Sequence, residues 1–268
     1  MSFASSFLLC AYSLWYVLSS TVQAAQEFDT GDVIHAHSIS PPILQNFWVD
    51  DMSSWSFGSS TVITDNYIRL TDFLLGSAGF IRNTQTNSVS TFELNVTLKV
   101  RRRNPLSFSS LGHSSVGIWY ITAEGFSPQG SNFIGIESQF NGVGVVLSDA
   151  DEISLVIGNG ARAVNATSLN EQRAGYCLIP KMSSCHITIT LRFTPGHLGV
   201  WYVLHGDAAS KRKPHSSTKI NIIPCLTVAA PTLKGNHFFG VTAMSSRSGL
   251  VEHDVYEVIM SPIVPSSG

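Results

Sequence analysis

The chain has 268 residues, enough for one large β domain. Charged residues make up only 13% of it, against roughly 25% in an average domain, and the formal net charge is −2. A charge this close to zero argues against nucleic acid and against an anionic membrane surface as partners. No long stretch of the mature chain repeats its apolar residues at helical spacing, so the sequence favours an all-β fold.

The first residues predict a signal peptide. An apolar stretch runs from Phe7 to Leu18, and the small–x–small pattern Val22-Gln23-Ala24 follows it. We therefore expect residues 1–24 to be a signal peptide and residues 25–36 to be a polar N-terminal segment. The segment lacks the Lys or Arg that usually begins a signal peptide, and a signal anchor is the alternative. No second apolar stretch approaches the ~20 residues that span a bilayer, so the chain as given is expected to be lumenal or secreted.

The segment from Phe92 to Val100 alternates apolar and polar residues, as a strand with one buried face does. This alternation places Asn95 on the outward face. Asn95 begins the sequon Asn-Val-Thr, and Asn165 begins a second sequon, Asn-Ala-Thr. Both asparagines are therefore candidate glycosylation sites.

The stretch from Gly112 to Leu147 holds three short apolar runs separated by Gly-, Ser- and Pro-rich turns. Runs of this kind are typical of consecutive strands in a β-sandwich. The strands predicted here and further along the chain are Val116–Ile121, Phe133–Ile136, Val143–Leu147, Ile153–Ile157, His186–Phe193 and Val200–His205. The last two are expected to pair through the Pro195-Gly196 turn.

Several short segments resemble the L-type (legume-like) lectins of the early secretory pathway. The family's G-D-G-L-A-x-W-Y block is similar to the residues that end in Trp119-Tyr120, and its I-R-L-T segment matches residues 68–71. Its F-G-I-S-A-A-T-G and D-D-H-D-V segments resemble residues 238–243 and 249–255. The resemblance runs from about His37 to Met260. It implies a concanavalin A-like antiparallel β-sandwich over residues 37–260, followed by a Ser/Pro-rich tail at 261–268.

Three cysteines remain after the predicted leader, namely Cys177, Cys185 and Cys225. An oxidising compartment favours one disulfide and leaves one thiol over, and the spacing alone does not choose the pair. The resemblance implies a bridge between Cys177 and Cys225, with Cys185 as the extra thiol.

In the family, a calcium ion orders the loops that hold a mannose residue. Alignment on Trp119-Tyr120 places the family's sugar-binding Asp at Ser114. The metal-binding Asp falls at Ser148, and the Asn that touches both metal and sugar falls at Glu152. The family's D-H-x-x-D falls near residues 165–168, and its Gly-rich turn is retained at 248–250. The candidate carbohydrate-binding residues are therefore Ser114, Glu152, Asn165, Ser248, Gly249 and Leu250.

The acidic residues Asp149, Asp151 and Glu152 are weaker candidates for a cation site in a shifted register. The alternative is a solvated acidic turn between two strands. We expect no cofactor; calcium is the one candidate, and most of the family's ligands for it are absent. The pair His35 and His37 is expected to lie in an exposed segment instead of binding metal.

The sequence does not favour an enzyme, because it has no G-x-S-x-G elbow and no groove motif flanks Asp149 and Asp151. The resemblance implies a lumenal lectin-like protein that recognises high-mannose glycoprotein cargo in ER–Golgi transport or quality control. Its expected location is the lumen of the ER, the ER–Golgi intermediate compartment or the Golgi. The alternative is a sugar-independent protein-binding module on the same sandwich, with the calcium site lost. Membrane association through a partner, or through a C-terminal anchor not present in this sequence, is left open.

Overall fold

The computed structural model describes residues 29–49, 54–102, 114–126, 133–148, 151–165, 169–180, 186–205, 222–245 and 251–264. The sandwich lies in one compact unit, Thr30–Ile263. The predicted signal peptide, Asp149, Cys185 and the 248–250 turn lie outside the described residues. Within the described ranges, no helix is long and apolar enough to span a membrane.

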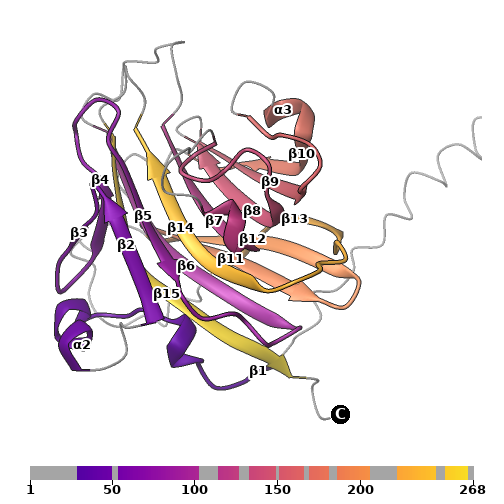
Figure 1. Ribbon diagram of the computed structural model, residues 1–268, viewed down its shortest axis with the longest axis horizontal. Coiled ribbons are helices and arrows are strands. Elements are labelled where there is room, and N and C mark those ends of the chain that lie inside the picture. The colour runs from indigo at the N-terminus through magenta and orange to yellow at the C-terminus, as the bar shows by residue number, and fades with distance from the viewer. Residues whose placement is uncertain are drawn as a thin grey trace, which may run out of the picture. The chain divides into compact units, whose positions relative to one another are not determined.

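Two antiparallel sheets form the sandwich that the sequence predicts (Figure 1). The eight-stranded sheet contains β13 (Ile223–Ala229), β12 (His197–His205), β11 (His186–Thr194), β6 (Phe92–Arg102), β15 (Val251–Val264), β4 (Ile68–Thr71) and β3 (Val62–Ile63), in that order, with β1 (Asp29–Thr30) beside β15. The seven-stranded sheet contains β10 (Arg173–Leu178), β9 (Glu152–Asn159), β8 (Asn141–Ser148), β7 (Ser115–Thr122), β14 (His237–Met244), β5 (Ala78–Asn83) and β2 (Trp55–Ser59). The described helical elements are short: α2 (Ile43–Val49), α3 (Leu169–Gln172) and the 3₁₀ turns η1 (His35–His37) and η3 (Ala123–Gly125).

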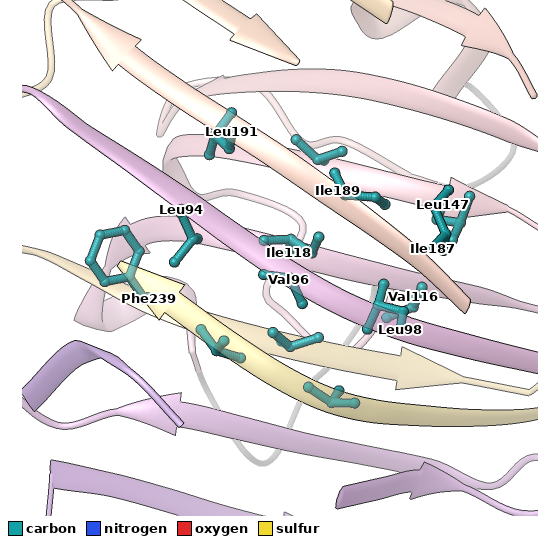
Figure 2. Close-up of a cluster of buried hydrophobic side chains, with 14 of the residues drawn as sticks. Leu94, Val96, Leu98, Val116, Ile118, Leu147, Ile187, Ile189, Leu191 and Phe239 are labelled. Carbon is teal, nitrogen blue, oxygen red and sulfur yellow. The ribbon is translucent and has the colours of Figure 1, made fainter. Parts of the chain in front are cut away.

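The main core lies between the sheets, because strands of both sheets turn alternate apolar residues inward. Figure 2 shows β6 and β11 presenting their leucines, isoleucines and valines to the opposite sheet. The residues labelled there are Leu94, Val96, Leu98, Ile187, Ile189, Leu191, Val116, Ile118, Leu147 and Phe239. The alternation predicted for β6 is confirmed, since its inward residues are buried and its outward residues are half-buried.

A second apolar cluster lies on the outer face of the seven-stranded sheet, around the buried Trp119. Its neighbours Ile118 and Tyr120 belong to the main core, so the indole points to the opposite face. The indole packs closely against two glycines. A Cβ added at Gly117 would lie 2.3 Å from a ring carbon, and one added at Gly144 would lie 2.1 Å from another. The indole Nε1 donates a hydrogen bond of 2.7 Å to Thr242 Oγ1, which satisfies its buried polar atom.

The prediction that Phe133–Ile136 forms a strand is wrong. These residues form a tight turn in which Phe133 and Ile136 exchange backbone hydrogen bonds of 3.1 and 3.0 Å. Ile134 and Gly135 have positive φ angles of 47° and 81°, which a strand does not adopt. The apolar run is buried because it packs over Trp119, and burial by packing does not require pairing in a sheet.

The sandwich extends beyond both ends expected for it. β15 continues to Val264, so residues 261–264 belong to a strand and not to a tail. Upstream, Gly31 and Ile34 donate backbone hydrogen bonds of 2.8 and 2.9 Å to Pro262 and Met260. His37, expected to be exposed, is 5% exposed, and its Nδ1 lies 3.1 Å from Asn83 Oδ1.

A disulfide joins Cys177 of β10 to Cys225 of β13, with the Cα atoms 5.4 Å apart. This is the pair that the resemblance implies. β10 and β13 are edge strands of different sheets, so the bridge ties the two layers together at one side of the sandwich.

Candidate functional site

The strand register gathers several candidate residues at one edge of the seven-stranded sheet, the edge at which β7 and β9 begin and β8 ends. Ser148 ends β8 opposite Ser115 at the start of β7, and it also pairs with Glu152 at the start of β9. Ser114, which is fully buried, directly precedes Ser115. Three positions that the resemblance assigns to sugar or metal, at 114, 148 and 152, therefore lie on neighbouring strands at the same edge.

The end of β14 reaches this edge as well, since Met244 pairs with Ser115. The next residue, Ser245, is buried, and its N–H donates a hydrogen bond of 2.8 Å to the Ser77 carbonyl. Ser248, Gly249 and Leu250 follow within five residues and lie outside the described residues.

Glu152 points to the outer face of the sheet, because its neighbour Ile153 belongs to the main core. Its Oε1 accepts a hydrogen bond from Arg173 Nη1, and a second of 2.7 Å from Ser154 Oγ. The Arg173 guanidinium also lies over the Tyr176 ring, 3.5 Å from its centroid. The carboxylate at this position is therefore held by a cation that belongs to the protein.

Asp151 is held by a different arginine. Its Oδ1 lies 3.1 Å from Nη2 of Arg102, which is the last residue of β6 in the opposite sheet. Its backbone is fixed too, since its N–H donates to Ser148 O at 3.2 Å and its carbonyl accepts from Ile179 at 2.8 Å. The φ of Asp151 is 58°, the left-handed conformation of a tight turn that Asp tolerates better than most residues. Asp151 is thus a structural turn residue in contact with both sheets.

The described residues do not fit a calcium site. Calcium takes six to eight oxygen ligands, and Asp151 and Glu152 each face a guanidinium instead. Throughout the ranges that the structure describes, no group of three or more His, Cys, Asp or Glu is placed to hold a metal ion. Ser148 also lacks the carboxylate that the resemblance expects there.

Asn165 lies in the connection between β9 and α3, which leaves the end of β9 opposite to Glu152. Its side chain is exposed, and its N–H donates a hydrogen bond of 3.3 Å to Gln172 Oε1. Gln172 also lines a hollow of about 280 Å³ with Ile157, Asn159, Arg162, Val164 and Glu171. The structure thus brings Ser114, Ser148 and Glu152 to one edge and places Asn165 in a separate connection.

The sequence did not predict the residues that hold Asp151 and Glu152. One signal pointed to Tyr176: if Cys177 turns inward to form a disulfide between the sheets, Tyr176 and Leu178 must face outward. Both are exposed, at 51% and 70%. Nothing in the local sequence marks Arg102 or Arg173 as partners, because each pair depends on the register of strands far apart in the chain.

Asn95 lies on the outer face of the eight-stranded sheet, as its alternation predicts. It is half-buried: its Oδ1 accepts a hydrogen bond of 2.6 Å from Thr190 Oγ1, and its Nδ2 donates to Glu93 Oε1 at 2.9 Å. The hydrogen bond to Glu93 uses one of the two hydrogens on Nδ2, and N-glycosylation replaces only one of them. A glycan on Asn95 is therefore compatible with this hydrogen bond. Glycosylation at Asn95 and Asn165 stays a prediction.

The sheets, their strand order and the site positions at one edge define a lectin-type β-sandwich. The model of the legume-like lectin family matches residues 31–266, so the chain belongs to this family. The solved structures similar to it include the exoplasmic/lumenal domain of VIP36 with Ca²⁺ and Man3GlcNAc bound (18% identity, TM-score 0.72, 90% of this chain and 93% of that chain covered).

Two further structures are similar to this chain. One is the carbohydrate recognition domain of Emp47p (13% identity, TM-score 0.68, coverage 89% and 100%). The other is a legume lectin-like domain from Entamoeba histolytica (14% identity, TM-score 0.66, coverage 87% and 100%). At these identities the likeness concerns the fold. No curated protein matches the chain in sequence.

Proposed function

We propose that this protein is a lumenal lectin of the early secretory pathway that recognises high-mannose glycans on glycoprotein cargo. The observation that carries the proposal is the gathering of Ser114, Ser148 and Glu152 at one sheet edge, directly beside the end of β14. Family membership supports the same role. The proposed location is the lumen of the ER, the intermediate compartment or the Golgi, and the proposed activity is recognition without catalysis.

The chemistry of this edge suits a neutral sugar. Serine hydroxyls donate and accept hydrogen bonds, and a carboxylate accepts them from sugar hydroxyls. The described bonds of Glu152 both end on Oε1, so Oε2 is the acceptor that a sugar hydroxyl would use. A serine at position 114 makes neutral hydrogen bonds, which are roughly half as strong as those of a carboxylate, so we expect weak affinity for a single sugar.

A second candidate function is a protein-binding module, and exposed apolar residues at the same edge favour it. Leu74 and Leu75 are each 65% exposed in the turn before β5, and Leu178 at the end of β10 is 70% exposed. Ser245 Oγ donates a hydrogen bond of 2.8 Å to the Leu74 carbonyl, which fixes this turn beside the end of β14. Exposed apolar side chains of this kind would give a protein partner apolar surface to bury.

The test is binding of the purified protein to immobilised high-mannose and complex-type glycans, with Glu152→Gln as the site variant. Glu124→Gln, which changes an exposed residue of η3 away from this edge, is the matched control. The proposal expects high-mannose glycans to be preferred and Glu152→Gln to weaken binding, with the control unchanged. Equal capture of a glycoprotein before and after removal of its glycans would instead support the protein-binding module.

A further inference from the structure

Two carboxylates that the structure describes in the turn between β8 and β9, those of Asp151 and Glu152, are each paired with an arginine from another strand. Glu152 is paired with Arg173 of β10 in the same sheet, and Asp151 is paired with Arg102 of β6 in the opposite sheet. The two guanidinium charges therefore balance the charges of these two carboxylates, as one divalent cation would.

The Arg173 pair is built into the sheet. The side chains of Arg173 and Glu152 are 15% and 18% exposed, so both charges are largely withdrawn from water. The guanidinium donates to the carboxylate and lies over the Tyr176 ring, and Ser154 donates to the same carboxylate oxygen. Burial, ring contact and shared hydrogen bonding hold the ion pair in one geometry, which most surface ion pairs lack.

The Arg102 pair connects the two layers. The side chains of Arg102 and Asp151 are 13% and 20% exposed. Asp151 is also held through its backbone by Ser148 and Ile179, at the ends of β8 and β10. Through this one residue, β6 of the eight-stranded sheet is linked to three neighbouring strands of the other sheet.

The geometry points to a replacement of the metal: Arg102 and Arg173 do for this turn what the family resemblance assigns to calcium. Each guanidinium is permanently charged and binds its carboxylate with directed N–H donors, so Asp151 and Glu152 are held in place without an ion from solution. Calcium would have to compete with Arg102 for Asp151 and with Arg173 for Glu152, and both arginines are largely buried. The edge of the sheet is therefore pre-organised and independent of calcium.

This inference rests on the proposed function in one respect, which is that this edge of the sheet is a binding site. Its test reads the order of the turn and involves no glycan, so its failure and the failure of the proposed function are distinguishable. The experiment is hydrogen exchange of peptides covering residues 148–154 in the full chain, together with the melting temperature, in calcium and in EDTA. The variants are Arg173→Gln and Arg102→Gln, and Arg162→Gln, an exposed arginine between β9 and α3, is the matched control.

We expect the wild type to give the same exchange and melting temperature in calcium and in EDTA. Arg173→Gln and Arg102→Gln should each raise exchange at the turn about tenfold, because a largely buried carboxylate loses its arginine. Arg162→Gln should change nothing. If Arg173→Gln does not fold, the double variant E152Q/R173Q is compared with E152Q. The double variant leaves no unpaired charge at this pair, whereas E152Q leaves Arg173 without its carboxylate, so the turn should exchange more slowly in the double variant. A wild type stabilised by calcium, or variants with unchanged exchange, would overturn the inference.

Discussion

Arg69 Nε lies 2.9 Å from Asp254 Oδ1, and Arg69 Nη2 lies 3.3 Å from Asp254 Oδ2, although the two residues are 185 positions apart. Asp254 is fully buried and also accepts a hydrogen bond from Arg101. Glu252 completes the group, because it lies 3.0 Å from each arginine. The Asp254 carboxylate raises the pKa of Arg69 above its usual value, mainly through this hydrogen bond. The I-R-L-T and H-D-V segments, which carried the family resemblance, therefore meet in one structural ion-pair network and not in the binding site.

Replacing Asp254 by Asn should destabilise the protein by about 3–5 kcal/mol, the range for breaking a buried ion pair by removing one partner. The substitution keeps the shape of the side chain and leaves two arginines facing Glu252 alone. The free energy of unfolding from urea titration checks this. Asp65→Asn, at an exposed position, is the control and should lie within error of the wild type. An Asp254→Asn variant as stable as that control would show that the network contributes nothing.

Breaking the disulfide with Cys177→Ser should cost about 2–5 kcal/mol, as for other disulfides in secreted domains. The bridge spans a sequence separation of 48 residues and ties the edge strands of both sheets, so its loss frees a long loop in the unfolded chain. Cys225→Ser should lose the same amount, and the double variant should lose no more than either single one. Unequal losses would mean that the cysteines do not act as a pair.

Gly144→Ala should destabilise the fold by about 1–3 kcal/mol through overpacking. The added Cβ would lie 2.1 Å from a Trp119 ring carbon, and the indole has no room to move because Gly117 supports its other part. Gly196→Ala is not a suitable control because its φ is 81°. Gly175→Ala is suitable, since its nearest neighbour would be 3.6 Å away. A melting temperature of Gly144→Ala equal to that of Gly175→Ala would contradict this packing.

Stability should fall as the pH drops from about 6.5 to 4. Burial lowers the pKa of His253 to about 4, with Asp254 opposing this shift and Arg102 adding to it. In that window the unfolded chain binds a proton at His253 and the folded chain does not, so protonation favours unfolding. Burial lowers the pKa of His37 and His237 in the same direction.

The free energy of unfolding measured across this pH range checks the assignment. One such histidine gives a slope of at most about 1.4 kcal/mol per pH unit, and His253→Gln should remove that share. His35→Gln, on an exposed residue, should leave the slope as it is in the wild type. An unchanged slope in His253→Gln would mean that another group dominates the acid sensitivity.

The sequence predicted those strands whose side chains alternate between core and surface. β6 and β11 are of this kind, and their register pairs Leu94 with Leu191 as the sandwich requires. Phe133–Ile136 has strand-like composition, yet it caps Trp119 as a turn. The apolar composition of a segment indicates that it is buried. Whether the segment pairs in a sheet depends on the elements that lie beside it, and the local sequence does not contain that information.

The placement of the candidate residues in the fold was predictable, and their contacts were not. Alignment on Trp119-Tyr120 was enough to place Ser114 at the edge where Ser148 and Glu152 also lie. Whether Glu152 faces a metal or an arginine depends on how β10 pairs with β9, because Arg173 of β10 reaches the Glu152 carboxylate. The partner of Asp151 comes from the opposite sheet, so only the packed structure reveals it.

Calcium-independent sugar binding is tested by calorimetric titration of the purified protein with a high-mannose oligosaccharide, first in calcium and then in EDTA. We predict saturable binding with the same Kd in both buffers, because the edge that bears Ser114 and Glu152 is ordered by arginines. Absence of binding in both buffers, with the melting transition intact, would contradict the lectin function. Binding that vanishes in EDTA would contradict the replacement of calcium by Arg102 and Arg173.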